Sequence, residues 1–169
     1  MKTRGLFLPL LVLAAVMLGL VADVLLTTQH LPARLATHFG ADGQANGWMT
    51  KAAHVRFVFG LGLGVPLFIL LVIAIVSRLG GAGLNIPHRK YWLAPERRTQ
   101  TLAFVQRRMV WFACLLVLDF AMIHRLILRA NTHTPAALEG AELWLPITII
   151  LAAIAVWTVS FIRPFLRTP

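Results

Sequence analysis

Residues 6–26 read LFLPLLVLAAVMLGLVADVLL, a run in which Asp23 is the only ionisable side chain. At 1.5 Å per residue, a helix of this length crosses the roughly 30 Å hydrocarbon core of a bilayer. Further apolar blocks of similar length follow at 57–76, 110–128 and 143–162. The sequence therefore predicts an all-α integral membrane protein with four transmembrane helices. The expected helices lie at about residues 6–27, 55–77, 95–129 and 143–163.

The overall composition supports this class, because 59% of the residues are hydrophobic and only 13% are charged. Soluble domains contain roughly 45–50% apolar and about 25% charged residues. No stretch outside the apolar blocks is long enough to fold alone. We therefore expect a single membrane domain over residues 1–169.

The basic residues set the expected orientation. The formal net charge is +10, but Lys and Arg cluster at the ends of the apolar blocks, so we expect no nucleic-acid partner. Cytoplasmic loops carry the excess of Lys and Arg. One side of the helices holds Lys2, Arg4, Arg78, Arg89, Lys90, Arg97, Arg98, Arg107, Arg108, Arg163 and Arg167. The other side holds Arg34, Lys51, Arg56, Arg125 and Arg129. Both termini and the 78–94 connection should thus be cytoplasmic, and the 28–54 and 129–142 loops extracytoplasmic.

The cytoplasmic connection ends at Pro95 and Glu96, a proline at the first helical position followed by an acid in the first turn. We expect the third membrane helix to begin there and to run unbroken into the bilayer. Its first turns should be amphipathic, with Arg98 at the anionic headgroups. The segment either sets topology, with Tyr91 and Trp92 as interfacial anchors, or docks a cytoplasmic partner.

The most individual stretch is the extracytoplasmic loop 28–54. Its Asp42–Gly43 and Asn46–Gly47 pairs are turn signals, and 36–39 could be extended, which favours a compact, turn-rich loop. Phe39 and Trp48 would suit the headgroup layer as anchors.

The same loop contains a pattern of fixed positions, namely Leu31, Pro32, His38, Phe39, Gly43, Gly47, Trp48 and Lys51. Placed between two membrane helices, this pattern resembles a bacterial domain-of-unknown-function family typified by SdpI-type immunity and signalling proteins. The resemblance covers about residues 6–77, while the second half resembles short stand-alone relatives. It implies a location in the bacterial plasma membrane and no catalytic residues. The arginine-containing motif of the longer SdpI-type proteins is absent from this sequence.

Asp119 lies midway along the third apolar block, where an ionisable residue costs several kcal/mol and is a functional candidate by default. Its neighbours on the same helical face are apolar, so its partner must come from another helix or a bound molecule. The simpler alternative is a neutral, hydrogen-bonded packing residue that contacts Thr148 or Thr158 on the fourth helix.

A second polar group gathers by depth near the outer face. Asp23, His30, His38 and His124 could together bind a transition metal, although no two of them have a paired ligand spacing. The alternative is a polar cluster in which Asp23 pairs with Arg125 or with a histidine. We expect His54 and His133 to be ordinary interfacial residues.

The second apolar block begins with Gly60 and Gly64, a small-residue pair that allows close helix packing. Packing within the chain and a homodimer seam are both open. Pro66 should kink this helix.

These features lead to three functional hypotheses. The first is a non-enzymatic accessory or regulatory membrane protein that binds a partner protein through the outer loop and the basic inner segment. The second is a structural subunit of a larger membrane complex. The third is a small membrane enzyme or transporter that uses the outer Asp and His residues. No nucleophile, phosphate-loop or thiolate-metal motif is present, so no cofactor is predicted.

Overall fold

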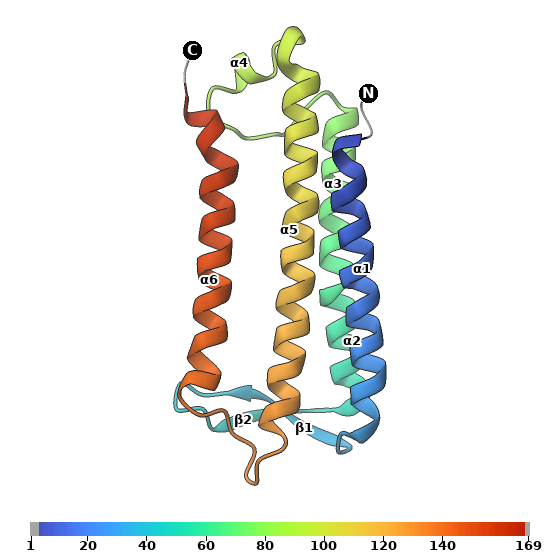
Figure 1. The fold of residues 1–169 in the computed structure, drawn as a ribbon, viewed down its shortest axis with the longest axis vertical. Coiled ribbons are helices and arrows are strands. Elements are labelled where there is room, and N and C mark those ends of the chain that lie inside the picture. The colour runs from blue at the N-terminus through green and yellow to red at the C-terminus, as the bar shows by residue number, and fades with distance from the viewer. Residues whose placement is uncertain (1–3, 168–169) are drawn as a thin grey trace.

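The computed structural model describes residues 4–167, so Lys2 lies outside the described residues. The helices are α1 (Arg4–Thr27), α2 (Lys51–Gly62), α3 (Gly64–Arg78), α4 (Arg89–Trp92), α5 (Pro95–Ala130) and α6 (Ala141–Ile162). The strands are β1 (Arg34–Phe39) and β2 (Ala45–Thr50), and short 3-10 turns follow α1 (η1, Thr28–His30) and α6 (η2, Arg163–Leu166). Figure 1 shows a bundle of upright helices with the strands lying across one end. We call that end the outer end and the end with α4 the inner end, following the predicted orientation.

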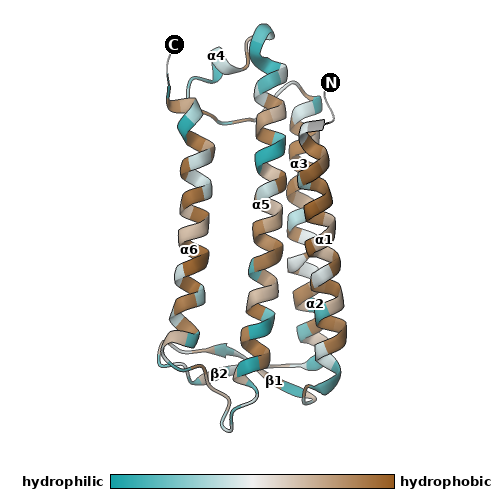
Figure 2. Cartoon of the chain, in the orientation of Figure 1, coloured by the Kyte–Doolittle hydropathy of each residue, from teal (hydrophilic) through white to brown (hydrophobic). Residues whose placement is uncertain are grey.

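The prediction of four membrane helices is confirmed. Four helical segments are long and apolar enough to cross a bilayer, namely Gly5–His30, Lys51–Arg78, Pro95–Ala130 and Ala141–Leu166. Figure 2 shows hydrophobic residues along most of α1, α3 and α6, whereas α5 also carries hydrophilic ones. Phe7 and Val156, for example, are each 70% exposed. Such surfaces would be unfavourable in water, so the chain is a multi-pass membrane protein whose helices contact lipid.

Helix α5 is the centre of the bundle, since it contacts α1, α2, α3 and α6. The buried core around it uses small and branched side chains from three helices, among them Leu20 of α1, Val58 of α2 and Val117 of α5. As predicted, α5 begins at Pro95. Helix α6 is different, because none of its residues is buried.

The second membrane span is divided at Leu63, which joins α2 to α3. The division lies just before Pro66, as the predicted kink requires, because proline cannot donate the hydrogen bond that would continue the helix. Of the two uses left open for Gly60 and Gly64, the described residues 4–167 show no close packing within the chain. A Cβ added at either would meet nothing within 4 Å, whereas one added at Gly62 would lie 3.0 Å from Leu20 and Phe120. The glycine that permits close packing is therefore Gly62, which is two positions from each member of the expected pair and lies on the opposite face of the helix.

The outer loop is a two-stranded antiparallel hairpin, which the all-α prediction did not include. Its turn is at Asp42–Gly43, as expected, and Gly43 has φ 78°. The Asn46–Gly47 pair is not a turn, because both residues lie within β2. Gly47 pairs with His38, and a Cβ at Gly47 would lie 3.0 Å from the His38 Cβ. Close contact between strands therefore explains this glycine.

At the inner end, aromatic residues join α4, α5 and the end of α6. The ring of Phe165 packs edge-on against Trp92 and Phe104, with centroids 5.6 Å away in both pairs. Thr101 Oγ1 donates a hydrogen bond to the Trp92 carbonyl at 2.8 Å. Trp92 is thus a packing residue of the inner cluster, and Arg97 stacks over the neighbouring Tyr91 ring at 4.0 Å.

Candidate functional site

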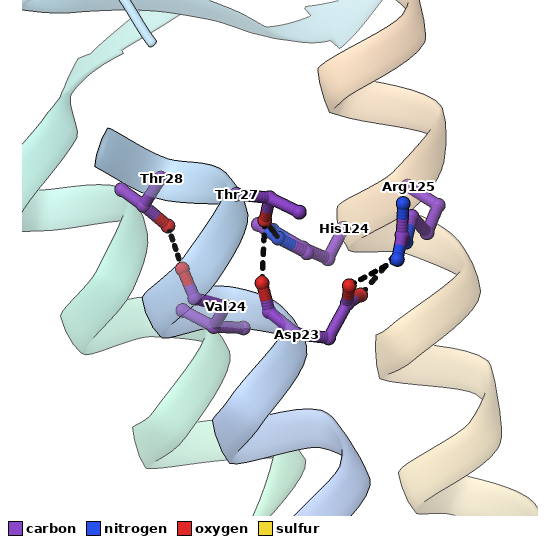
Figure 3. Close-up of polar contacts among 6 residues, drawn as sticks. All are labelled: Asp23, Val24, Thr27, Thr28, His124 and Arg125. Carbon is purple, nitrogen blue, oxygen red and sulfur yellow. Dashed lines mark hydrogen bonds and ion pairs between the residues drawn. The ribbon is translucent and has the colours of Figure 1, made fainter. Parts of the chain in front are cut away.

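A polar cluster lies at the outer end of the bundle, where α1, α2 and α5 meet beneath the hairpin. It consists of Asp23 and Thr27 from α1, His54 from α2, and His124 and Arg125 from α5. Figure 3 shows the α1 and α5 members, together with the bond from the Thr28 hydroxyl to the Val24 carbonyl. Threonine hydroxyls on α1 thus also satisfy carbonyls of their own helix, a bonding mode common for Thr in membrane helices.

Asp23 and Arg125 form the charged part of this cluster. The Arg125 Nε donates to Asp23 Oδ2 at 2.8 Å, and a second guanidinium nitrogen contacts the other carboxylate oxygen. Of the two partners predicted for Asp23, the structure selects the arginine. The two charges cancel, which lowers the cost of placing either one near the hydrocarbon layer.

The two histidines of the cluster belong to a chain of hydrogen bonds in which each group donates to the next, from His54 through His124 and Thr27 to the Asp23 carbonyl. The Thr27 hydroxyl donates to the Asp23 carbonyl at 2.6 Å, because a carbonyl oxygen can only accept. The Thr27 oxygen lies 2.9 Å from His124 Nε2, so this nitrogen must carry the proton. His124 Nδ1 is then an acceptor, and His54 Nε2, 2.9 Å away, is its donor. This assignment takes both rings as neutral, and each ring then has a single tautomer that satisfies the contacts.

His54 corrects the expectation of an ordinary interfacial residue. Its side chain and that of His124 are both fully buried, and their rings stack with centroids 5.2 Å apart. Its remaining nitrogen, Nδ1, is buried and has no hydrogen-bond partner among the described residues. The sequence signal was the spacing of His54 to Val58, which puts both on the same buried face of α2.

The expected metal ligands do not come together. His30 and His38 are exposed, and within residues 4–167 the one side-chain hydrogen bond of His38 is with its neighbour Thr37, at 3.3 Å between Nδ1 and Oγ1. Within residues 4–167, no three His, Cys, Asp or Glu side chains form a group that could hold a metal ion. The structure therefore divides the predicted group, keeping Asp23 and His124 near one another and leaving the other two apart.

The hairpin above this cluster is fixed from two sides. The side-chain amide of Asn131, just after α5, accepts from the Ala36 N–H at 3.0 Å and donates to the Ala36 carbonyl at 2.8 Å. At the other end, the Leu138 N–H donates to the Gly43 carbonyl at 2.9 Å. A Cβ at Gly43 would lie 1.8 Å from the Leu138 carbonyl oxygen, so only glycine allows this contact. The two outer loops therefore form one connected unit.

Other residues of the loop pattern close the ends of the hairpin. The Leu31 N–H donates to the Thr28 carbonyl at 3.2 Å, which ends the turn after α1. The Lys51 N–H donates to the Ala33 carbonyl at 2.9 Å, and its Nζ reaches the Gln29 carbonyl at 3.4 Å. Trp48, in contrast, is half exposed. Several residues of the pattern thus shape the hairpin, and Trp48 is its exposed large hydrophobic side chain.

Asp119 is half-buried in α5, about one and a half turns before His124 on the same helix. The Thr148 hydroxyl donates to the Trp144 carbonyl at 2.9 Å, within its own helix. Neither Thr148 nor Thr158 hydrogen bonds to Asp119, and within residues 4–167 the two ion pairs use Asp23 and Glu142 instead. The expected contact with α6 is therefore not formed.

Comparison with known proteins gives one match. A family model described as a domain of unknown function, DUF1648, matches residues 6–63. No curated protein and no solved structure matches the chain. The matched part comprises α1, the hairpin and α2, and it ends where the second span divides at Leu63. The match to this family model thus covers about a third of the chain, and it includes the polar-cluster members Asp23, Thr27 and His54.

Proposed function

We propose that the protein is a non-enzymatic accessory or regulatory membrane protein that binds a partner protein at its outer face. The observation that carries this proposal is the hairpin, which is held in place by Asn131 and by the Gly43–Leu138 contact and which presents Trp48 outward. A surface that is already ordered loses little conformational entropy on binding. Tryptophan is also the residue type that most often supplies binding energy at protein interfaces.

The polar cluster supports a structural contribution more than a chemical one. The Asp23 carboxylate is neutralised by Arg125, and His124 has both ring nitrogens engaged. These groups join α1, α2 and α5 directly beneath the hairpin, so they hold the presented surface to the membrane bundle. The enzyme or transporter hypothesis would need these same groups to be free for a substrate.

The resemblance of the loop to SdpI-type proteins supports a regulatory or immunity-like function in a bacterial plasma membrane. In that setting the partner is a membrane protein or an extracytoplasmic one that reaches the outer face. The exposed Trp48 could instead serve only as a headgroup anchor, and the experiment must separate the two uses.

The test is affinity purification of the tagged protein, expressed in its native host at native level, in mild detergent, followed by quantitative mass spectrometry. We expect a partner in stoichiometric amount with the wild type and its loss with Trp48→Ala. Trp144→Ala is the matched control, because Trp144 is 52% exposed and Trp48 is 50% exposed, both at the outer end. A protein that purifies alone, or equal losses with both variants, would refute partner binding through the hairpin.

A second candidate function is that of a structural subunit in a larger membrane complex. It is favoured by α6, which has no buried residue and packs mainly against α5. Cross-linking in intact membranes followed by native mass spectrometry tests it. A structural subunit should give a complex of the same composition in the wild type and in the Trp48→Ala variant.

A further inference from the structure

Asp119 lies on the face of α5 that is turned toward α6. Two turns before it on the same face is Phe112, whose ring packs on Trp157 of α6 at 4.4 Å between centroids. Three turns before it is Arg108, whose carbonyl accepts a hydrogen bond from the Trp157 indole at 3.2 Å. The carboxyl of Asp119 is therefore placed along the α5–α6 seam, further toward the outer end.

The part of α6 opposite Asp119 offers no polar partner. The helices are antiparallel, so two turns beyond the Phe112–Trp157 contact, Asp119 is level with Ile150. The nearest hydroxyl along α6, that of Thr148, is already donated to the Trp144 carbonyl. A carboxyl at this depth thus meets an apolar helix, and it lies in the hydrocarbon part of the span, where an unpaired acid costs several kcal/mol.

The seam between α5 and α6 is held at its two ends. At the inner end the contacts are Phe112–Trp157 and the stacked pair Phe104–Phe161. At the outer end, Arg129 Nε donates to Glu142 Oε1 at 2.5 Å. Asp119 lies between these two contacts along α5. Figure 1 shows α6 standing apart from the other helices of the bundle.

We propose that the α5–α6 face around Asp119 binds a transmembrane helix of a partner protein that carries an Arg or Lys at midspan. Charge complementarity carries the choice of partner. Two other acids on the membrane helices, Asp23 and Glu142, are each neutralised by an arginine from a neighbouring helix. A second copy of this chain fits less well, because a symmetric contact at this face brings two Asp119 carboxyls together. The inference rests on the proposed partner binding and states where in the membrane it occurs.

The test is photo-cross-linking in intact cells with p-benzoylphenylalanine placed at Ile123, one turn from Asp119. The same probe at Leu118, which is 52% exposed on another face of α5, is the matched control. We expect the Ile123 probe to capture a transmembrane segment with a basic residue near its middle. Asp119→Leu should reduce the yield about tenfold, while Asp119→Glu and Leu118→Ala should preserve it. Exchange of the two charges, with Asp119→Arg and the partner's basic residue changed to Asp, should restore it.

The possible outcomes separate this inference from the proposed function. Capture of a second copy, of lipid alone, or of a segment without a basic residue overturns the inference. So does a partner complex that Trp48→Ala dissolves and Asp119→Leu leaves intact, although the proposed function then stands. If Asp119→Leu abolishes the capture and Trp48→Ala has no effect, the membrane contact is supported and the outer-face proposal is refuted.

Discussion

His54 Nε2 lies 2.9 Å from His124 Nδ1, and both imidazoles are fully buried between α2 and α5. The bond joins residues that are 70 positions apart in the chain. It is also the only described side-chain hydrogen bond between the second membrane span and α5 within residues 4–167. We therefore expect this pair to fix the outer half of α2 against the rest of the bundle.

Removal of the pair should lower stability. His54→Ala leaves the His124 acceptor unsatisfied and opens a cavity, so the free energy of unfolding should fall by about 2–4 kcal/mol. His54→Gln should lose less than His54→Asn, because the glutamine amide nitrogen can reach the position of the imidazole Nε2. Thermal unfolding in detergent measures the difference, with the exposed His133 changed to Ala as control. Equal losses for Gln and Asn would contradict the assigned donor.

Gly43→Ala should separate the two outer loops. The added Cβ would meet the Leu138 carbonyl oxygen, and the residue would also keep a positive φ. Gly83→Ala is the matched control, since Gly83 has φ 81° but nothing within 4 Å of an added Cβ. Backbone strain alone costs roughly 1 kcal/mol, so any larger loss at position 43 reports the clash. Hydrogen exchange should then rise at residues 131–140 and around 43 only in the Gly43 variant.

A similar comparison tests the packing of α2. Gly62→Ala brings a Cβ within 3.0 Å of Leu20 and Phe120, whereas Gly60→Ala enters open space. We expect Gly62→Ala to destabilise the protein by about 1–3 kcal/mol through overpacking. Gly60→Ala should be neutral or slightly stabilising, because alanine favours the helix. Melting temperatures of the two variants check this, and a larger loss at Gly60 would indicate that this face is covered in the membrane.

The orientation can be measured with single cysteines. The native Cys114 is buried, so Cys114→Ala provides a background without a reactive thiol. In intact cells, a membrane-impermeant maleimide should label Thr132→Cys at the outer end and should not label Lys90→Cys until the membrane is opened. Labelling of Lys90→Cys alone in intact cells would reverse the assigned orientation.

The sequence predicted those features that depend on one helix at a time. Apolar length located the spans, Pro95 marked the start of α5, and Pro66 marked the division of the second span. Gly62 and His54 could not be assigned, because their roles depend on how far α2 is rotated and at what depth it meets α1 and α5. A shift of one residue turns a helix by about 100°, which is enough to exchange Gly62 for its neighbours.

The outer loop shows the same limit at a strand. The turn at Asp42–Gly43 follows from the local sequence. The Asn46–Gly47 pair has the same turn-like sequence, but it lies in β2. The small size of Gly47 is required by His38 on the opposite strand, and no local pattern reports that. Arg125 could be named as one of two partners for Asp23 because both residues lie at the same depth. That His30 and His38 lie apart from Asp23 and His124 depends on the path of the hairpin, which the sequence does not report.

The match to DUF1648 stops at Leu63, yet the polar groups of that part find their partners in α5. His54 bonds to His124, Asp23 to Arg125, and the hairpin to Asn131. Residues 6–63 therefore do not form a self-contained folding unit, although the family match ends there. A fragment excised at residue 63 would leave three polar positions without partners in lipid or detergent, unless another helix supplied the groups that α5 and Asn131 provide here.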